Sequence, residues 1–258
     1  MVSVIMPAYN AEKTIAASVA SVLAQTYGDY ELIIIDGHST DGTLAAARAA
    51  VADSDRVKII SLGKKNSLSF TRNFGVGIAR GEWIAYLDSD DMWDAEKLKK
   101  QTAFIKETGA EISYTASAFI DEAGARYRYI MPAVFIFTYA MLLKKNLMSC
   151  SSVIIKKSLA KKYPMGGDEM HEDYSCWLSV LRECGHACGL NLPLLTYRLS
   201  KGSKSAGRIK SARMIFNSYR REGRTAAAAF FMSLRYARHS ISKRIKIKMS
   251  GKISVPIE

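Results

Sequence analysis

Three aspartates and a serine follow a short apolar run near residue 90, and their types and spacing suit metal and phosphate chemistry. Trp83–Leu87 is mostly apolar, which predicts a buried strand, and Asp88-Ser89-Asp90-Asp91 comes directly after it. In an open α/β sheet, ligands bind at the carboxyl ends of the strands. Carboxylate oxygens suit Mg²⁺ or Mn²⁺, which would in turn hold a diphosphate. The alternative is that Asp91 or Asp94 caps the following helix and the other acids are solvated.

Alternating strands and helices are predicted to position these acids. The unbroken apolar core of Glu31–Asp36 is typical of a parallel strand that is buried on both faces. Strand and helix patterns alternate at short spacing, which predicts an α/β fold with a doubly wound, mostly parallel sheet and flanking helices. The other predicted strands are Val2–Met6, Val57–Ser61, Trp83–Leu87 and Ile112–Ala116. The predicted helices are Thr14–Gln25, an alanine-rich run that ends at Ala52, Leu68–Ala79 and Ala95–Thr108.

Composition places the chain among ordinary globular proteins. It has 258 residues, of which 48% are hydrophobic and 24% charged. The four cysteines have no Cys-x-x-Cys spacing and no neighbouring zinc ligands, so we expect reduced cytosolic thiols. The N-terminus has no signal-peptide pattern. Ile130–Leu143 carries no charge but is too short to span a bilayer, so we expect a buried helix or strand, with contact to a lipid as the alternative.

The positive charge is concentrated at the C-terminus. Residues 201–258 contain 15 lysines and arginines but only two acids, Glu222 and Glu258, so this segment carries the whole formal net charge of +13. Apolar residues recur at helical spacing, with basic residues mainly on other faces, which predicts a basic amphipathic helix on an anionic membrane surface. The alternative is a helix that packs on the rest of the chain and leaves its basic face solvated. We expect no nucleic-acid partner, because no recognisable motif accompanies the basic stretch. The apolar positions are Phe230, Leu234, Ala237, Ile241 and Ile245, and the basic ones are Arg235, Arg238, Lys243, Arg244, Lys246 and Lys248.

The order of several motifs resembles glycosyltransferase family 2, a family of inverting sugar transferases with the GT-A fold and nucleotide-sugar donors. The resemblance covers residues 1–205 and implies a nucleotide-sugar-binding half, 1–116, and an acceptor and catalytic-base half, 117–205. Residues 206–258 are then a basic helical extension. The motifs are Pro7-Ala8-Tyr9-Asn10, Asp36 with Ser39-Thr40-Asp41-Gly42-Thr43, Arg72-Asn73-Phe74-Gly75, Gly81-Glu82 with Leu87-Asp88-Ser89-Asp90-Asp91, His171-Glu172-Asp173 with Trp177-Leu178, and Tyr197-Arg198 with Ser203 and Ser205.

For the donor diphosphate, the resemblance implies a Mn²⁺ or Mg²⁺ ion held chiefly by Asp90. Asp88 is expected near the ribose or in the outer shell of the metal, and Ser89 belongs to the same predicted donor-binding set. A divalent ion at the diphosphate neutralises the charge of the leaving group. Arg72 is predicted to reach a phosphate, with a surface ion pair as the alternative.

For the nucleotide base, the resemblance implies a pocket at the ends of the first two strands. Pro7, Ala8 and Tyr9 would line it, with Tyr9 as a stacking partner, and Asp36 would accept a hydrogen bond from the base. Related sequences usually have a second acid at Gly37 and often glycine at His38, which leaves the nucleotide preference open. We interpret His38 as a loop residue.

Direct displacement at the anomeric carbon requires a general base for the acceptor hydroxyl. The resemblance implies that Asp173 is this base, with Glu172 beside it. If Tyr174–Cys184 is a helix, Asp173 lies at its N-cap or in its first turn, where the helix dipole favours the ionised carboxylate. A purely capping aspartate would look the same in the sequence.

These expectations describe a metal-dependent glycosyltransferase at the inner face of the cytoplasmic membrane. It would move a hexosyl or N-acetylhexosaminyl group, from a UDP-sugar by preference, to a lipid-linked glycan in lipopolysaccharide, capsule or other surface-polysaccharide biosynthesis. The alternatives are a polyprenyl-phosphate sugar transferase and a non-catalytic, membrane-associated module that binds nucleotides or sugars.

Overall fold

The computed structural model describes residues 1–51, 54–167, 169–200 and 208–253. The elements of the first half are β1 (Val2–Ala8), α1 (Ile15–Leu23), β2 (Tyr30–Asp36), α2 (Thr43–Val51), β3 (Val57–Ser61), α3 (Leu68–Ile78), β4 (Trp83–Tyr86), β5 (Met92–Trp93), α4 (Lys97–Thr108) and β6 (Ile112–Ile120). Those of the second half are β7 (Arg126–Met131), β8 (Ile136–Thr138), α5 (Tyr139–Leu142), the 3₁₀ turn Cys150–Ser152, β9 (Ile154–Lys156), α6 (Lys157–Lys162), α7 (Glu172–Cys184), β10 (His186–Arg198), α8 (Arg208–Arg221) and α9 (Ala226–Met249).

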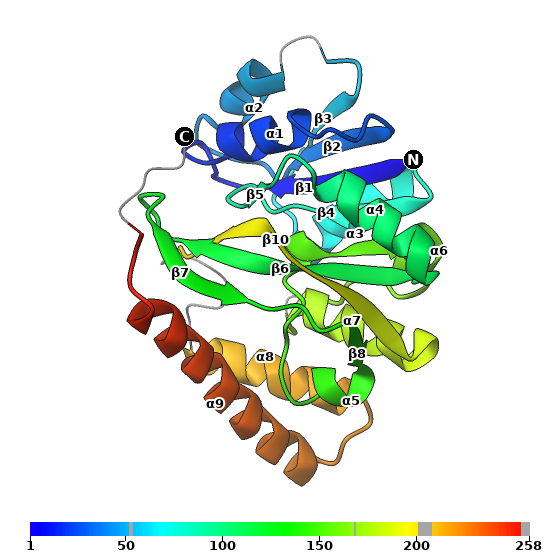
Figure 1. Ribbon diagram of the computed structural model, residues 1–258, viewed down its shortest axis with the longest axis vertical. Coiled ribbons are helices and arrows are strands. Elements are labelled where there is room, and N and C mark those ends of the chain that lie inside the picture. Colours follow the sequence, from blue (N-terminus) through cyan, green and yellow to red (C-terminus); the bar gives the residue numbers. More distant parts are fainter. Residues whose placement is uncertain (52–53, 168, 201–207, 254–258) are drawn as a thin grey trace.

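The strands of the described residues join in one sheet, in the order β3-β2-β1-β4-β9-β6-β10-β5 (Figure 1). The strands β3, β2, β1 and β4 are mutually parallel, as predicted. The second half is mixed, because β9 lies antiparallel between β4 and β6 while β10 runs parallel to β6. Strand β7 pairs with β6, and strand β8 pairs with β10. The sheet thus crosses the predicted division at residue 116, which falls inside β6.

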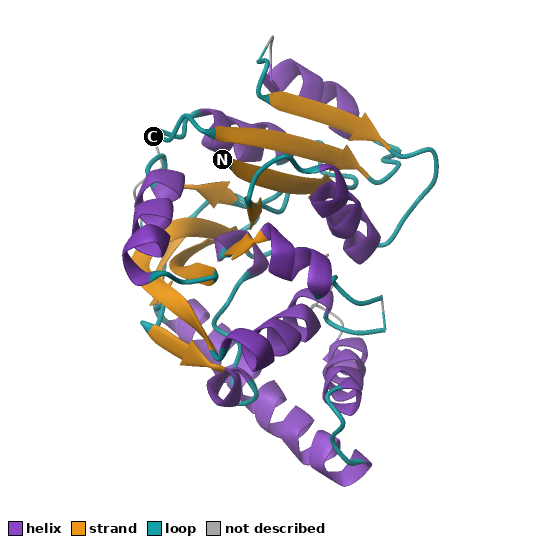
Figure 2. Ribbon diagram, turned by 90° about the vertical axis from the view of Figure 1, so that its right-hand side faces the viewer, coloured by secondary structure: helices purple, strands orange, loops and turns teal. Residues whose placement is uncertain are grey.

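Helices flank the strands of the sheet (Figure 2). Alternate residues of the central strands contribute to two cores, one on each face of the sheet. Val4 and Leu32 face the core that α1, α2 and α4 cover. Ile5 and Ile33 face the opposite core, to which α3, α6 and α7 contribute. The central strands are buried along both faces, which explains their unbroken apolar sequence.

The segment between β6 and α7 is more varied than the sequence indicates. The uncharged stretch Ile130–Leu143 contains the end of β7, the strand β8 and the short helix α5. Its side chains are mixed in exposure: Phe137 and Leu142 are buried, whereas Phe135 is exposed. The stretch is therefore divided between sheet and helix, as its interruptions by Pro132 and Thr138 suggest.

Two C-terminal helices, α8 and α9, pack against each other at the end of the molecule opposite α1 and α2 (Figure 1). The inner face of α9 contributes Ala229 and Tyr236 to the main core. Four residues of the predicted apolar face, Phe230, Leu234, Ile241 and Ile245, are exposed. In the part of the chain that the structure describes, none of the helices combines the length and apolarity needed to cross a bilayer.

Candidate active site

The acidic segment begins where β4 ends, beside the ends of β1 and β2. Leu87 continues the β4 direction, with its N–H donating to the carbonyl of Ile5. The backbone N–H of Asp88 donates to Oγ of Ser151 at 3.1 Å, so the 3₁₀ turn behind the segment fixes its first acid. Asp88, Ser89 and Asp90 are partly exposed. These side chains therefore lie at the carboxyl edge of the parallel sheet, where a ligand is expected.

Asp91 differs from its neighbours because it is buried, with 1% of its surface exposed. One carboxylate oxygen accepts the backbone N–H of Arg198 at 2.9 Å, and the Arg198 side chain donates to the carbonyl of Asp90 at 3.0 Å. Burial, and then the charges of Asp90 and Asp88, raise the pKa of Asp91 well above its usual range. Asp91 thus fastens the end of β10 to the acidic segment, a structural role different from the predicted capping role.

Asp88 and Asp90 fit a divalent cation that is shared with a diphosphate. Burial, and then the negative charge of Asp88, raise the pKa of Asp90 to about 6, so a cation held by both carboxylates would offset their mutual repulsion. Among the described residues, no group of three or more His, Cys, Asp or Glu side chains could hold a metal ion by itself. Mg²⁺ bound by one or two carboxylates, with phosphate oxygens and water completing its shell, needs only such an open pair.

Arg72 joins the acidic segment to the first turn of α7. Its Nη2 donates to Asp88 Oδ1 at 2.5 Å, and its Nη1 donates to Glu172 Oε1 at 3.1 Å. The Arg72 side chain is only 2% exposed, and its Nε has no hydrogen-bond partner among the described residues. The bridge is buried, so the alternative of a surface ion pair is wrong, whereas the contact of Arg72 with a phosphate stays a prediction.

The neighbouring Asn73 holds the chain that leads into α7. Its side-chain amide donates to the carbonyl of Met165 at 2.9 Å and accepts the Met165 N–H at 3.0 Å. Helix α7 begins at Glu172, two residues earlier than the predicted segment, and Trp177 and Leu178 anchor it in the core. Arg72 therefore contacts the first turn of α7, and Asn73 fixes the backbone at Met165.

Asp173 lies in that first turn and is not the N-cap, which is His171. Its side chain is half-buried, and its Oδ1 accepts the N–H of Tyr174 at 2.7 Å. Burial and the adjacent Glu172 raise the pKa of Asp173, whereas Arg72 and His171 oppose the shift. A carboxylate with a raised pKa is a better proton acceptor, which suits a general base.

The predicted base pocket lies at the ends of β1 and β2. Pro7 and Ala8 are paired with Ile35 and Asp36 in the parallel register, and both are buried. Tyr9 is 43% exposed, with the Lys65 ammonium 4.5 Å from its ring centroid. These contacts place Pro7, Ala8, Tyr9 and Asp36 at one edge of the sheet.

The Asp36 carboxylate is buried and already hydrogen-bonded. It accepts the N–H and Oγ–H of Ser39 and the hydroxyl of Ser61. His38 is exposed and has φ of +72°, a left-handed conformation that glycine adopts more readily than other residues. The His38 side chain thus faces solvent, while Asp36 fixes the loop through Ser39.

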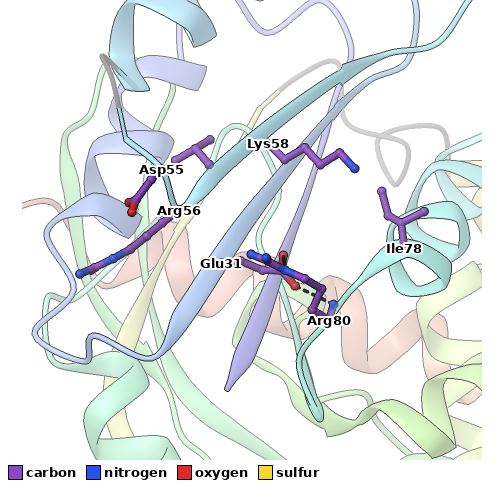
Figure 3. A pocket seen from close by; sticks show the side chains of 7 residues that line it. Glu31, Asp55, Arg56, Lys58, Ile78 and Arg80 are labelled. Atoms are coloured by element: carbon purple, nitrogen blue, oxygen red, sulfur yellow. Dashed lines mark hydrogen bonds and ion pairs between the residues drawn. The ribbon is translucent and has the colours of Figure 1, made fainter.

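A separate small pocket opens at the opposite ends of the strands (Figure 3). It has a volume of about 240 Å³ and is lined by Glu31, Arg56, Lys58, Arg80 and three neighbours. The Glu31 carboxylate accepts Ser3 Oγ–H at 2.6 Å and both the backbone N–H and the Nε–H of Arg80. Glu31 therefore fastens β1, β2 and the residues before β4 together, away from the acidic segment.

Comparison with known proteins decides the family. Residues 3–162 match the family model described as glycosyl transferase family 2. The chain belongs to glycosyltransferase family 2. This family member is 32% identical over 246 residues to TuaG of Bacillus subtilis, and the alignment covers 95% of this chain and 98% of TuaG. TuaG is named as a teichuronic acid biosynthesis glycosyltransferase. It is 34% identical over 218 residues to the Escherichia coli UDP-Glc:alpha-D-GlcNAc-diphosphoundecaprenol beta-1,3-glucosyltransferase WfgD, covering 81% of each chain.

Solved structures place this family 2 enzyme in the GT-A fold. Residues 1–349 of S. aureus TarS in complex with UDP-GlcNAc match with a TM-score of 0.73 and 20% identity, over 93% of this chain and 72% of that one. The mannosyltransferase PcManGT from Pyrobaculum calidifontis, in complex with GDP-Man and Mn²⁺, matches with a TM-score of 0.68 and 15% identity, over 98% of this chain and 76% of that one. These similarities confirm the predicted family and fold, and the protein is a glycosyltransferase.

Two residues of the glycosyltransferase site were outside the predicted set. Oγ of Ser151 accepts a hydrogen bond from the Asp88 N–H, and the Ser151 carbonyl accepts one from Trp93 Nε1–H at 2.7 Å. Arg198 contacts Asp90 and Asp91. Tyr197-Arg198 was part of the resemblance and could have indicated Arg198, whereas no local pattern marks Ser151. Ser203 and Ser205, from the same closing segment, lie outside the described residues.

Proposed function

We propose that this enzyme transfers one sugar, with inversion, from a UDP-sugar to a lipid-linked glycan during cell-surface polysaccharide biosynthesis. The observation that carries the proposal is the Arg72 bridge, which ties Asp88 of the acidic segment to Glu172, beside Asp173. A donor-side acid pair and a candidate base are thereby held in one connected site. The arrangement supports catalysis over the alternative of a silent binding module.

The proposed reaction is a single displacement at the anomeric carbon. Asp173 accepts the proton of the acceptor hydroxyl as its oxygen forms the new glycosidic bond, and the bond to the nucleoside diphosphate breaks. Asp90, with Asp88, would hold Mn²⁺ or Mg²⁺, which supplies neutralisation of the leaving diphosphate. Pro7, Ala8 and Tyr9 would contact the base, with Asp36 beside them. Ser89 belongs to the donor-binding set, and Arg72 orients Asp88 and Glu172.

The choice of substrates draws on the named relatives. WfgD is named for UDP-Glc as donor and a GlcNAc-diphosphoundecaprenol acceptor, and TarS was solved with UDP-GlcNAc. TuaG is named for teichuronic acid biosynthesis. These names support a UDP-sugar, a lipid-linked saccharide acceptor and a role in surface-polysaccharide synthesis for this chain.

We also propose that α9 places the enzyme on the inner face of the cytoplasmic membrane as a peripheral protein. Its exposed apolar residues Phe230, Leu234, Ile241 and Ile245 point away from the core contacts of Ala229. Basic residues interleave with them along the same helix. An exposed apolar stripe with cationic neighbours is the pattern of a helix that lies in the interface of anionic lipids.

One transfer assay tests these proposals together. The purified protein, Mn²⁺ and UDP-glucose or UDP-GlcNAc are mixed with GlcNAc-diphosphate-lipid in vesicles of phosphatidylcholine, with or without phosphatidylglycerol. We expect transfer with inverted configuration, faster on the anionic vesicles because the basic residues of α9 raise the local enzyme concentration. Absence of transfer from either donor on both vesicles would refute the proposed acceptor chemistry, and equal rates on both would refute only the membrane role.

A further inference from the structure

Lys243 lies on the face of α9 that packs against the rest of the protein. On that face it lies between two residues, Tyr236 and Ile247, that contact the two sides of the candidate active site. Tyr236, Lys243 and Ile247 are separated by seven and four residues, so they lie on one face of the helix. Lys243 is half-buried, although its sequence neighbourhood groups it with the exposed basic residues of the tail. The reason is that α9 packs through this face, which turns Lys243 toward the protein.

The contact on one side of Lys243 leads to the candidate base. The ring of Tyr236 lies 5.2 Å from the ring of Tyr174, measured between centroids, and Tyr174 directly follows Asp173. The hydroxyl of Tyr174 is fixed in turn by Leu142 and Tyr219. This end of the face therefore packs beside the first turn of α7.

The contact on the other side leads to the acidic segment. Ile247 is buried in a small cluster with Phe119 and Met131, and Tyr197 packs against that cluster. Tyr197 directly precedes Arg198, which contacts Asp90 and Asp91. Lys243 thus lies on the helix face between the α7 first turn and the end of β10.

The Lys243 ammonium group has no hydrogen bond or ion pair to any other described residue. Burial and the adjacent Arg244 lower its pKa, and the charge of Asp173 opposes this shift, so the ammonium is within electrostatic range of the candidate base. A partly buried cation without a close anionic partner is unfavourable. An anion that enters beside Asp173 would remove this cost.

We infer that Lys243 binds the diphosphate of the lipid-linked acceptor and so places the acceptor sugar at Asp173. The inference rests on the proposed function. In the acceptor, the diphosphate lies between the lipid and the sugar. On α9, the apolar stripe faces outward, where the lipid would lie, and Lys243 faces inward, where the diphosphate would lie. The order of the two features on α9 therefore matches the order of the two groups in the acceptor. The donor diphosphate is assigned to Asp88 and Asp90 at the other side of the Arg72 bridge.

The test compares two soluble acceptors that differ only in the diphosphate. One is GlcNAc α-linked through diphosphate to an octyl chain, and the other is octyl α-GlcNAc without phosphate. In Lys243→Met we expect KM for the diphosphate acceptor to rise about tenfold or more, because the variant loses one charge-assisted hydrogen bond to the diphosphate. KM for octyl α-GlcNAc and for the UDP-sugar should stay within about twofold of wild type. Lys243→Arg should recover part of the loss, and the exposed Lys106→Met on α4 serves as the matched control.

Each other outcome has a defined meaning. Equal rises in KM for both acceptors would show a structural role and overturn the inference. A rise in KM for the UDP-sugar would assign Lys243 to the donor diphosphate instead, and an unchanged KM for the diphosphate acceptor would exclude any role in binding it. If the wild type glycosylates neither acceptor, the proposed function itself fails, which is distinct from an active wild type with an unaffected Lys243→Met.

Discussion

Replacement of Asp173 by asparagine is expected to lower kcat by about 10²–10⁴-fold, the usual contribution of a general base. Asparagine keeps the size of the side chain and can still accept the N–H of Tyr174, so the first turn of α7 should persist. The loss should therefore fall on the chemical step, with the melting temperature and the affinity for UDP unchanged.

The pH profile distinguishes a base from a structural residue at this position. Because Asp173 must be ionised to accept a proton, wild-type kcat/KM should fall as the pH drops through its raised pKa. This acidic limb should be absent from the residual activity of Asp173→Asn. Glu183→Gln, at the exposed far end of the same helix, is the control and should behave as wild type. Full activity in Asp173→Asn would remove Asp173 from the mechanism.

Replacement of Arg72 by methionine is expected to lower the free energy of unfolding by about 3–5 kcal/mol. The substitution breaks the ion pair that Arg72 makes with the buried Glu172 and removes one hydrogen bond of Asp88. The measurement is denaturant unfolding followed by circular dichroism. Lysine should not restore the bridge, because a single ammonium lacks the planar fork that reaches two carboxylates.

A surface ion pair provides the comparison for this experiment. Lys100 pairs with Glu96 one helical turn away, and both side chains are exposed, so Lys100→Met should leave the unfolding midpoint unchanged. The account of Arg72 as a buried bridge would be wrong if Arg72→Met unfolded at the wild-type midpoint as well.

The first half of the fold and its acids were predictable because their signals are local. The apolar runs of β1, β2 and β4 and the helical spacing of α1 and α3 are read from neighbouring residues. The ends of parallel strands meet at one edge, so the position of Asp88 and Asp90 followed from the topology. The motif order supplied Asp173 through the family resemblance.

The remaining features depend on partners that are distant in the sequence. Arg72 and Glu172 are 100 residues apart, and Asp91 and Arg198 are 107 apart, so no local pattern reveals either contact. The antiparallel insertion of β9, a strand of only three residues, is equally invisible. For α9, the periodicity indicated one apolar face but not that a second face, with Ala229, Tyr236 and Ile247, packs on the core.

The metal dependence of UDP binding tests the central assignment most directly, since it requires no knowledge of the acceptor. Thermal shift is measured with UDP, with and without Mn²⁺, on the wild type, Asp90→Asn and Asp173→Asn. We expect UDP to raise the melting temperature of the wild type and of Asp173→Asn only when Mn²⁺ is present, because ligand binding stabilises the folded state. Asp90→Asn should lose this metal-dependent shift. A UDP shift that is independent of Mn²⁺, or that persists in Asp90→Asn, would contradict the assignment of Asp88 and Asp90 as the donor and metal site.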